Sequence, residues 1–132
     1  MRNFRKFTPF MCAVYNGHLE CVKELFELKR VYDVDIKERN IFHLCACQNN
    51  IECFRYLIKQ IPNQSDVIKI LFKRDKSGNT ILHNAAHNGH FEFIASILKE
   101  FTGNLICVYL KFIDICTFFQ YFHNLHKKFY KL

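Results

Sequence analysis

Three stretches of this 132-residue chain follow one pattern of residue types, and this internal repeat constrains the fold more than any other feature. They align without gaps and run from Thr8 to Phe26, from Asn40 to Ile58 and from Thr80 to Leu98. Each copy contains two short stripes of apolar residues at spacings of three and four, which is typical of a pair of helices. Because helices this short are marginal alone, we expect the copies to stack and to cover one another.

The break between the two helices of each copy falls at a residue that tolerates a left-handed backbone. Gly17 and Gly89 stand there in the first and third copies, and glycine enters this region at no steric cost. Asn49-Asn50 takes the same place in the middle copy, and asparagine is the next best residue for it. The pattern therefore predicts a short helix, a sharp turn and a second helix in every copy.

Small residues recur at matching places and predict where neighbouring copies touch. Ala13, Cys45 and Ala85 are equivalent, and we expect them to occupy one buried row. Cys21 and Cys53, which correspond to Phe93, are interpreted in the same way, as small apolar residues in a packed stack.

The recurring segments resemble a known repeat family. TPFMCA, NIFHLCA and TILHNAA open the copies and are followed by NGHLE, NNIE and NGHFE, which resembles the ankyrin repeat across residues 8–100. The resemblance implies an all-α, ankyrin-like helix-turn-helix solenoid of about three repeats, with short finger loops between units and a C-terminal helical tail. It also implies that Thr80 caps the first helix of the third unit beside His83, and that Asn40 and His43 have the same roles in the second unit. The structural residues that it selects are Thr8, Pro9, Gly17, His43, Thr80, His83 and Gly89.

The repeat pattern also divides the chain. We assign residues 1–103 to the array, with units that start near 8, 40 and 80 and an insertion at 61–70. Pro62 should stop the helix before it, and we expect Ser65 or Asp66 to cap one further turn through Val67–Phe72. Residues 104–132 form an aromatic, basic tail outside the pattern. A cap on the third unit, an amphipathic helix and a membrane segment stay open for this tail, as does the origin of the chain as a fragment of a longer repeat protein.

Charge and apolar runs narrow the classes of partner. The net charge of +7 lies mostly at the two ends, and residues 8–104 carry 12 Lys or Arg against 11 Asp or Glu. A nucleic-acid groove would need its basic excess on the body, so we expect no nucleic acid partner. Residues 105–122 are apolar, but Lys111 and Asp114 near their middle favour a buried or interfacial helix over a membrane span. Membrane contact by the tail stays open as an alternative to a buried or solvated helix.

The seven cysteines predict reduced thiols rather than a disulfide framework. Their number is odd and no secretory signal precedes them, which favours an intracellular, cytoplasmic location. A zinc site at His43, Cys45, Cys47 and Cys53 is disfavoured, since the chain has no CxxC pair and two of these side chains at most share a helix face. No nucleophile, metal-protease or phosphate-loop motif occurs, so we predict no enzymatic activity and no cofactor.

The function expected from this frame is non-catalytic binding of a partner protein, as an interaction module or scaffold. In an ankyrin-like stack the finger tips and the outer face of the first helices line one concave surface. We expect Tyr15, Leu44 and His87, which are larger than packing or capping demands, to be exposed on that face. The other first-helix positions expected to be exposed are Cys12, Asn16, Cys47, Gln48, Asn84 and Asn88. The residues predicted to bind a partner are Tyr15, Asp35, Lys37, Arg39, Leu44, Lys73, Arg74, Lys76 and His87. Two alternatives stay open: the cytoplasmic ankyrin portion of a larger membrane protein such as a cation channel, and a substrate adaptor of a ubiquitin ligase.

Overall fold

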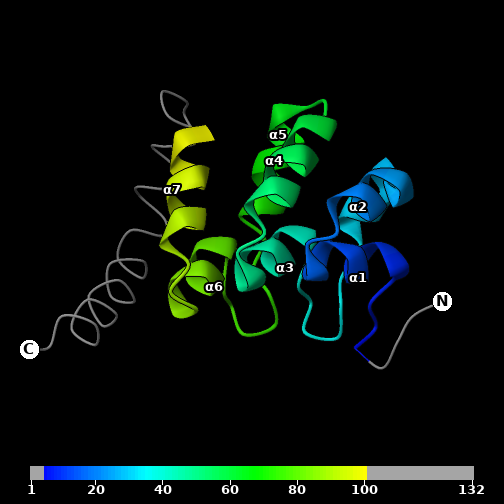
Figure 1. Ribbon diagram of the computed structural model, residues 1–132. Helices are drawn as coiled ribbons and strands as arrows, with labels where there is room; N and C mark the ends of the chain where they lie inside the picture. The colour runs from blue at the N-terminus through cyan, green and yellow to red at the C-terminus, as the bar shows by residue number, and fades with distance from the viewer. Residues whose placement is uncertain (1–4, 101–132) are drawn as a thin grey trace, which may run out of the picture.

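The computed structural model describes residues 5–100, and every regular element within that range is a helix. The predicted tail at 104–132 and the end of the predicted array lie outside the described residues. The elements in chain order are α1 (Pro9–Asn16), α2 (Leu19–Leu25), the 3-10 helix η1 (Leu28–Tyr32), α3 (Ile41–Gln48), α4 (Ile51–Gln60), α5 (Gln64–Leu71), α6 (Ile81–His87) and α7 (Phe91–Glu100). Figure 1 shows them as three successive helix pairs with α5 added beside α4.

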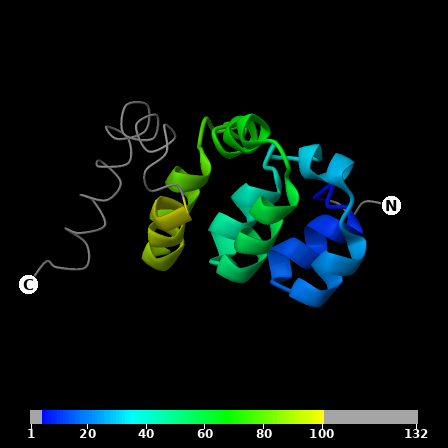
Figure 2. The same ribbon diagram turned by 90° about the horizontal axis from the view of Figure 1, so that it is seen from above.

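The helix pairs stack side by side and form two rows. The first helices α1, α3 and α6 pack in one row, and α2, α4 and α7 pack in the other. The loops that enter α3 and α6 hang below the first row in Figure 1, and the view from above in Figure 2 separates the three pairs. This is the all-α helix-turn-helix solenoid that the sequence predicts.

Side-chain caps start the first helix of each pair. The Thr8 hydroxyl accepts a hydrogen bond from Met11 N at 3.1 Å, and Pro9 follows at the first helical position, where its missing N–H costs nothing. Asn40 and Thr80 cap α3 and α6, and each backbone N–H donates to a histidine ring three residues later. The cap and the histidine satisfy each other's free backbone donors, as in a capping box.

Left-handed residues end the same helices. Gly17, Asn49 and Gly89 have φ values of 72°, 57° and 74°. At Gly17 a second constraint applies, because a Cβ there would lie 2.8 Å from Asn50 Oδ1. The Asn50 amide donates to the carbonyls of Val14 and Tyr15 at 2.8 and 2.9 Å, so this close approach ties the second unit to the first.

The interior of the stack holds the small residues in one row. Ala13, Cys45 and Ala85 are all buried at equivalent places. Phe54 on α4 then joins two units, since its ring centroid lies 5.8 Å from that of Phe42 and 4.9 Å from that of Phe93 on α7. Such tilted aromatic pairs add packing energy to the area that they bury.

Three residues lie elsewhere than the sequence predicts, and one cause explains them. Leu44 is fully buried and Asn84 is 7% exposed, so the expectation that both face a partner is wrong. Their equivalent in the first unit, Cys12, is only half-buried. Cys21 is exposed although its equivalents Cys53 and Phe93 are buried. These positions are buried only where a unit precedes them, which indicates that they face the preceding unit.

The insertion at 61–70 forms a helix that packs against the array. Asn63, rather than Ser65 or Asp66, caps it by accepting a hydrogen bond from Ser65 N at 3.0 Å, and α5 is two turns long instead of one. Helix α5 buries Val67, Ile70 and Leu71. The Asn40 side chain donates to the Ile70 carbonyl at 2.9 Å, so the cap of α3 also fixes the end of the insertion.

Candidate functional site

The two finger loops are built on the same turn, which an aspartate organises. Asp35 Oδ1 accepts hydrogen bonds from the N–H groups of Lys37 and Arg39 at 2.9 and 2.8 Å. Asp75 Oδ1 accepts from Ser77 and Asn79, both at 2.9 Å. Aspartate at the start of a loop favours such local bonds to the backbone. Each aspartate stands five residues before the cap of the next helix, so the turn sets how the chain enters α3 and α6.

One position in each finger has a left-handed backbone. Gly78 has φ 81°, and its equivalent Glu38 has φ 60°. A residue with a Cβ pays a steric cost there of about 1–2 kcal/mol relative to glycine. Glu38 therefore supplies the conformation that the missing glycine of the first finger would have supplied, at a cost in stability.

Consecutive fingers are joined backbone to backbone. Ile36 N donates to the Arg5 carbonyl at 3.0 Å, and Lys76 N donates to the Lys37 carbonyl at 2.8 Å. Arg5 and Lys37 are equivalent residues, each three positions before a helix cap. The fingers thus form one continuous edge in which each loop holds the next in register.

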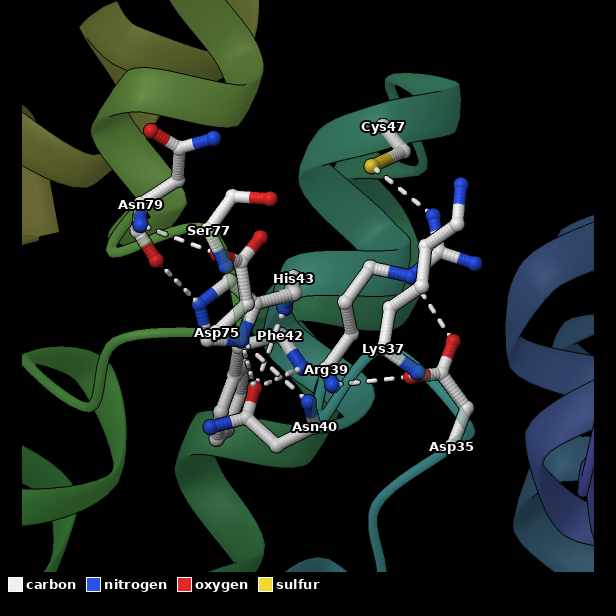
Figure 3. A network of polar contacts seen from close by, with 10 residues as sticks. All are labelled: Asp35, Lys37, Arg39, Asn40, Phe42, His43, Cys47, Asp75, Ser77 and Asn79. Carbon is white, nitrogen blue, oxygen red and sulfur yellow. Dashed lines mark hydrogen bonds and ion pairs between the residues drawn. The ribbon is translucent and has the colours of Figure 1, made fainter.

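Arg39 closes the first finger against the first helix of its own unit. Its Nε donates to Asp35 Oδ2 at 2.7 Å, and its Nη1 lies 3.8 Å from Cys47 Sγ, as Figure 3 shows. Burial acts to lower the pKa of Arg39, but the hydrogen bond and negative charge of Asp35 together with the contact of Cys47 outweigh it, so the pKa is raised overall. Asp35 itself is 3% exposed, and the expectation that it is a solvent-facing tip residue is wrong, because its carboxylate faces Arg39 and its own turn.

The buried histidine of the second unit joins it to the finger that follows. His43 Nδ1 accepts from Asn40 N at 3.2 Å, and its Nε2–H donates to the Asn79 carbonyl at 3.0 Å. Both nitrogens are therefore engaged in the neutral ring (Figure 3). Burial lowers the pKa of His43, which keeps the ring uncharged near neutral pH.

The first-helix face contributes three partly accessible side chains. Tyr15 is half-buried, with its ring 5.4 Å from that of Phe7 and 5.9 Å from the Arg5 guanidinium. Cys47 is half-buried, and burial raises its pKa although Arg39 acts in the opposite direction. Its thiol is therefore protonated and a poor nucleophile at neutral pH. His87 is exposed on α6.

The four remaining predicted binding residues all reach solvent on the fingers. Lys37, Lys73 and Lys76 are exposed, and none of them takes part in an ion pair of the described residues. Arg74 is exposed as well, and its Nη1 donates to the Gly78 carbonyl at 2.7 Å. The structure thus brings Tyr15, Lys37, Lys73, Arg74, Lys76 and His87 to the surface, holds Arg39 partly covered, and removes Asp35 and Leu44 from it.

A metal centre and a membrane span are two further kinds of feature that residues 5–100 do not form. No group of three His, Cys, Asp or Glu side chains converges in that range on a site for a metal ion. Of the cluster considered from the sequence, His43 is bonded to Asn79, Cys47 lies beside Arg39, and Cys45 is in the core. None of the helices of that range is long and apolar enough to cross a bilayer.

Comparison with protein families agrees with this geometry. A family model of ankyrin repeats in three copies matches residues 1–66, and a model of ankyrin repeats in many copies matches residues 41–95. The chain belongs to the ankyrin-repeat family. Ankyrin repeats are general protein–protein interaction modules.

Two curated relatives share most of this chain's ankyrin array. An ankyrin repeat protein of Rickettsia bellii is 33% identical over 95 residues, which cover 71% of this chain and 14% of that protein. The leucine-rich repeat serine/threonine-protein kinase 1 of Caenorhabditis elegans is 24% identical over 99 residues, which cover 74% of this chain and 4% of the kinase. The chain spans a small part of both relatives, so their activities as whole proteins carry no argument for this one.

Two residues of the candidate surface were missed from the sequence. Arg5 belongs to the finger edge, although it precedes the first aligned copy. Its equivalence to Lys37, three residues before the cap, was the signal that could have found it. Ile36 is 50% exposed at the middle of the edge, and its position beside a charged tip gave no such signal.

Proposed function

We propose that this ankyrin-repeat chain binds a partner protein without catalysis, through its finger loops and the exposed side chains of its first helices. The surface consists of Tyr15, Lys37, Lys73, Arg74, Lys76 and His87, with Arg39 partly covered at its centre. The observation that carries the proposal is the continuous finger edge, in which hydrogen bonds within and between loops fix the backbone that carries the exposed side chains. A surface ordered before binding loses little conformational entropy when a partner docks.

The chemistry of the site supports binding rather than catalysis. The histidine rings of the second and third units are used as caps, and the thiol of Cys47 is kept protonated by burial. Neither arrangement presents an activated base or nucleophile to a substrate.

The test is affinity enrichment of partners by the intact chain, measured by quantitative mass spectrometry. The variant Tyr15→Ala/Lys37→Ala/His87→Ala should lose the partners that the wild-type chain enriches. A matched control, Lys59→Ala/Lys69→Ala/Lys99→Ala, changes three exposed residues on α4, α5 and α7 and should keep them. Equal enrichment by both variants would show that the partner uses another face.

The domain division and the two alternatives are proposals of the same kind. We propose that the array ends near residue 103 and that residues 104–132 act outside it; a chain ending at Gly103 with the same partners and the same Tm would contradict a role for the tail. Enrichment of a ubiquitin-ligase subunit would favour the role as a substrate adaptor of a ubiquitin ligase. Recovery of the protein in membranes together with channel subunits would favour the role as the ankyrin portion of a larger membrane protein. The intracellular location stays a prediction from the odd number of cysteines.

A further inference from the structure

The fold separates the charges of this chain, although they look balanced along the sequence. Residues 5–6, 35–39 and 73–77 hold seven Lys or Arg and three Asp or Glu. All other residues between 5 and 100 hold seven Lys or Arg and eight Asp or Glu. The basic excess of the described residues therefore lies in the fingers, and the helices that face away from them carry none of it.

Two of the three acidic groups of the fingers, Asp35 and Asp75, are turned toward their own loops, whereas Glu38 and the lysines are exposed to solvent. The carboxylates of Asp35 and Asp75 accept hydrogen bonds from their own turns, and Asp35 also binds Arg39. Lys37, Lys73 and Lys76 are exposed and lack carboxylate partners among the described residues. Two of the three finger carboxylates that could neutralise these lysines are thus already engaged, and Glu38 remains as the one exposed acid among them.

The register of the fingers places two lysines on adjacent backbones. The hydrogen bond from Lys76 N to the Lys37 carbonyl makes these two lysines direct neighbours on adjacent loops. Like charges on adjacent backbones repel and lower stability slightly when no anion lies between them. A ligand that brings carboxylates to this edge would remove the repulsion and gain the attraction.

We propose that the finger edge, residues 5–6, 36–38 and 73–77, binds an acidic segment of the partner protein. This inference rests on the proposed function and names the chemistry of the partner. Ile36 and Glu38 favour a peptide over a nucleic acid. The exposed Ile36 offers an apolar contact between the cations, and the exposed Glu38 carboxylate repels a backbone with a charge on every phosphate. A peptide can place carboxylates opposite the lysines and an apolar or basic residue opposite Ile36 and Glu38.

The test is a selection of 12-residue peptides from a random display library, with the intact chain as bait. We expect the selected peptides to be enriched in Asp and Glu relative to the library. Fluorescence anisotropy should show that the variant Lys37→Glu/Lys73→Glu/Lys76→Glu binds them on the order of tenfold or more weakly at low salt, since each exposed charge pair contributes modestly. Wild-type binding should weaken as the NaCl concentration rises.

The control variant is Lys59→Glu/Lys69→Glu/Lys99→Glu, which makes the same change of net charge on α4, α5 and α7. It should bind the selected peptides as the wild type does. Peptides without acidic enrichment that bind all three chains equally would overturn this inference and leave the proposed function standing. Tighter binding through the finger lysines to a 20-nucleotide oligouridylate, or to vesicles with phosphatidylserine, would also overturn it, in favour of a nucleic acid or a membrane. If no peptide is selected and Tyr15→Ala/Lys37→Ala/His87→Ala keeps every enriched partner, both proposals fail.

Discussion

Replacing Asp35 by asparagine tests the central contact of the first finger. The side chain keeps an oxygen in the place of Oδ1, which can still accept the two backbone hydrogen bonds of the turn. It loses the anionic Oδ2 that lies 2.7 Å from Arg39 Nε, and puts an amide NH₂ against that donor. Hydrogen bonds to charged groups contribute about 1.5–3 kcal/mol when their partners are shielded from water.

The exposure of the pair sets where in that range the effect lies. The Asp35 side chain is fully covered and that of Arg39 is 15% exposed, so water can replace the lost anion only in part. We expect the free energy of unfolding to fall by about 2 kcal/mol, which corresponds to roughly 4–8 °C in Tm for each kcal/mol in a domain of this size. Denaturant titration and thermal melts of the intact chain measure both.

The second finger provides a matched control. Asp75 organises the same turn, but the residue equivalent to Arg39 is Asn79. Asp75→Asn should therefore cost only about 0.5 kcal/mol, the range of a surface change that keeps its acceptor. A double-mutant cycle of Asp35→Asn with Arg39→Gln should give a coupling energy of about 1–2 kcal/mol. Equal costs at Asp35 and Asp75, or a coupling below about 0.3 kcal/mol, would show that the pair adds nothing to the turn.

Three further predictions concern the buried amide of Asn84, the left-handed residues of the fingers, and the buried ring of His43. Asn84→Leu should raise the free energy of unfolding by about 1–2 kcal/mol in denaturant titration, because it removes a buried Nδ2 without a hydrogen-bond partner among the described residues. Asn88→Leu should not, because Asn88 is the exposed C-cap residue of α6 and its amide donates to the Asn84 carbonyl. Glu38→Gly should raise the free energy of unfolding, and with it Tm, whereas Gly78→Ala should lower both. Each change in free energy equals the cost of a Cβ in the left-handed region, about 1 kcal/mol. Because the pKa of His43 is lowered in the folded chain, the unfolded chain takes up a proton there at a higher pH than the folded chain does. The free energy of unfolding should therefore fall as pH drops below about 6.5, and this fall should be smaller in His43→Gln.

The sequence was sufficient to predict the helix pairs, their caps and their turns, because those features depend on local chemistry. Thr8 and Asn40 cap helices through their own hydroxyl and amide, and Gly17 ends one through its own backbone. Each of these decisions involves residues within a few positions of one another. Because the pattern occurs three times, each copy supported the assignment of the other two.

The exposure of Leu44 and Asp35 could not be predicted in the same way, because it depends on what lies next to them in space. Leu44 shares its position with Cys12 and Asn84 on the first helices, where the resemblance to an ankyrin stack implied an exposed outer face. The position instead faces the preceding unit. Asp35 looked like a charged tip, but an aspartate five residues before a helix cap recurs at Asp75, and that spacing was an available signal for a structural turn.

The distribution of charge shows why a sum along the chain is misleading for a repeat protein. Residues 8–104 carry an excess of one positive charge, and that near balance argued against a nucleic acid partner. A contiguous window adds each finger to the helices that follow it, where acids and bases such as Glu20 and Lys23 pair on one helix. The stack brings fingers that are 40 residues apart in the sequence into hydrogen-bond contact, as Lys37 and Lys76 show. Charge on a repeat protein should therefore be summed over equivalent positions of successive units, and here that sum places the positive potential on the finger edge.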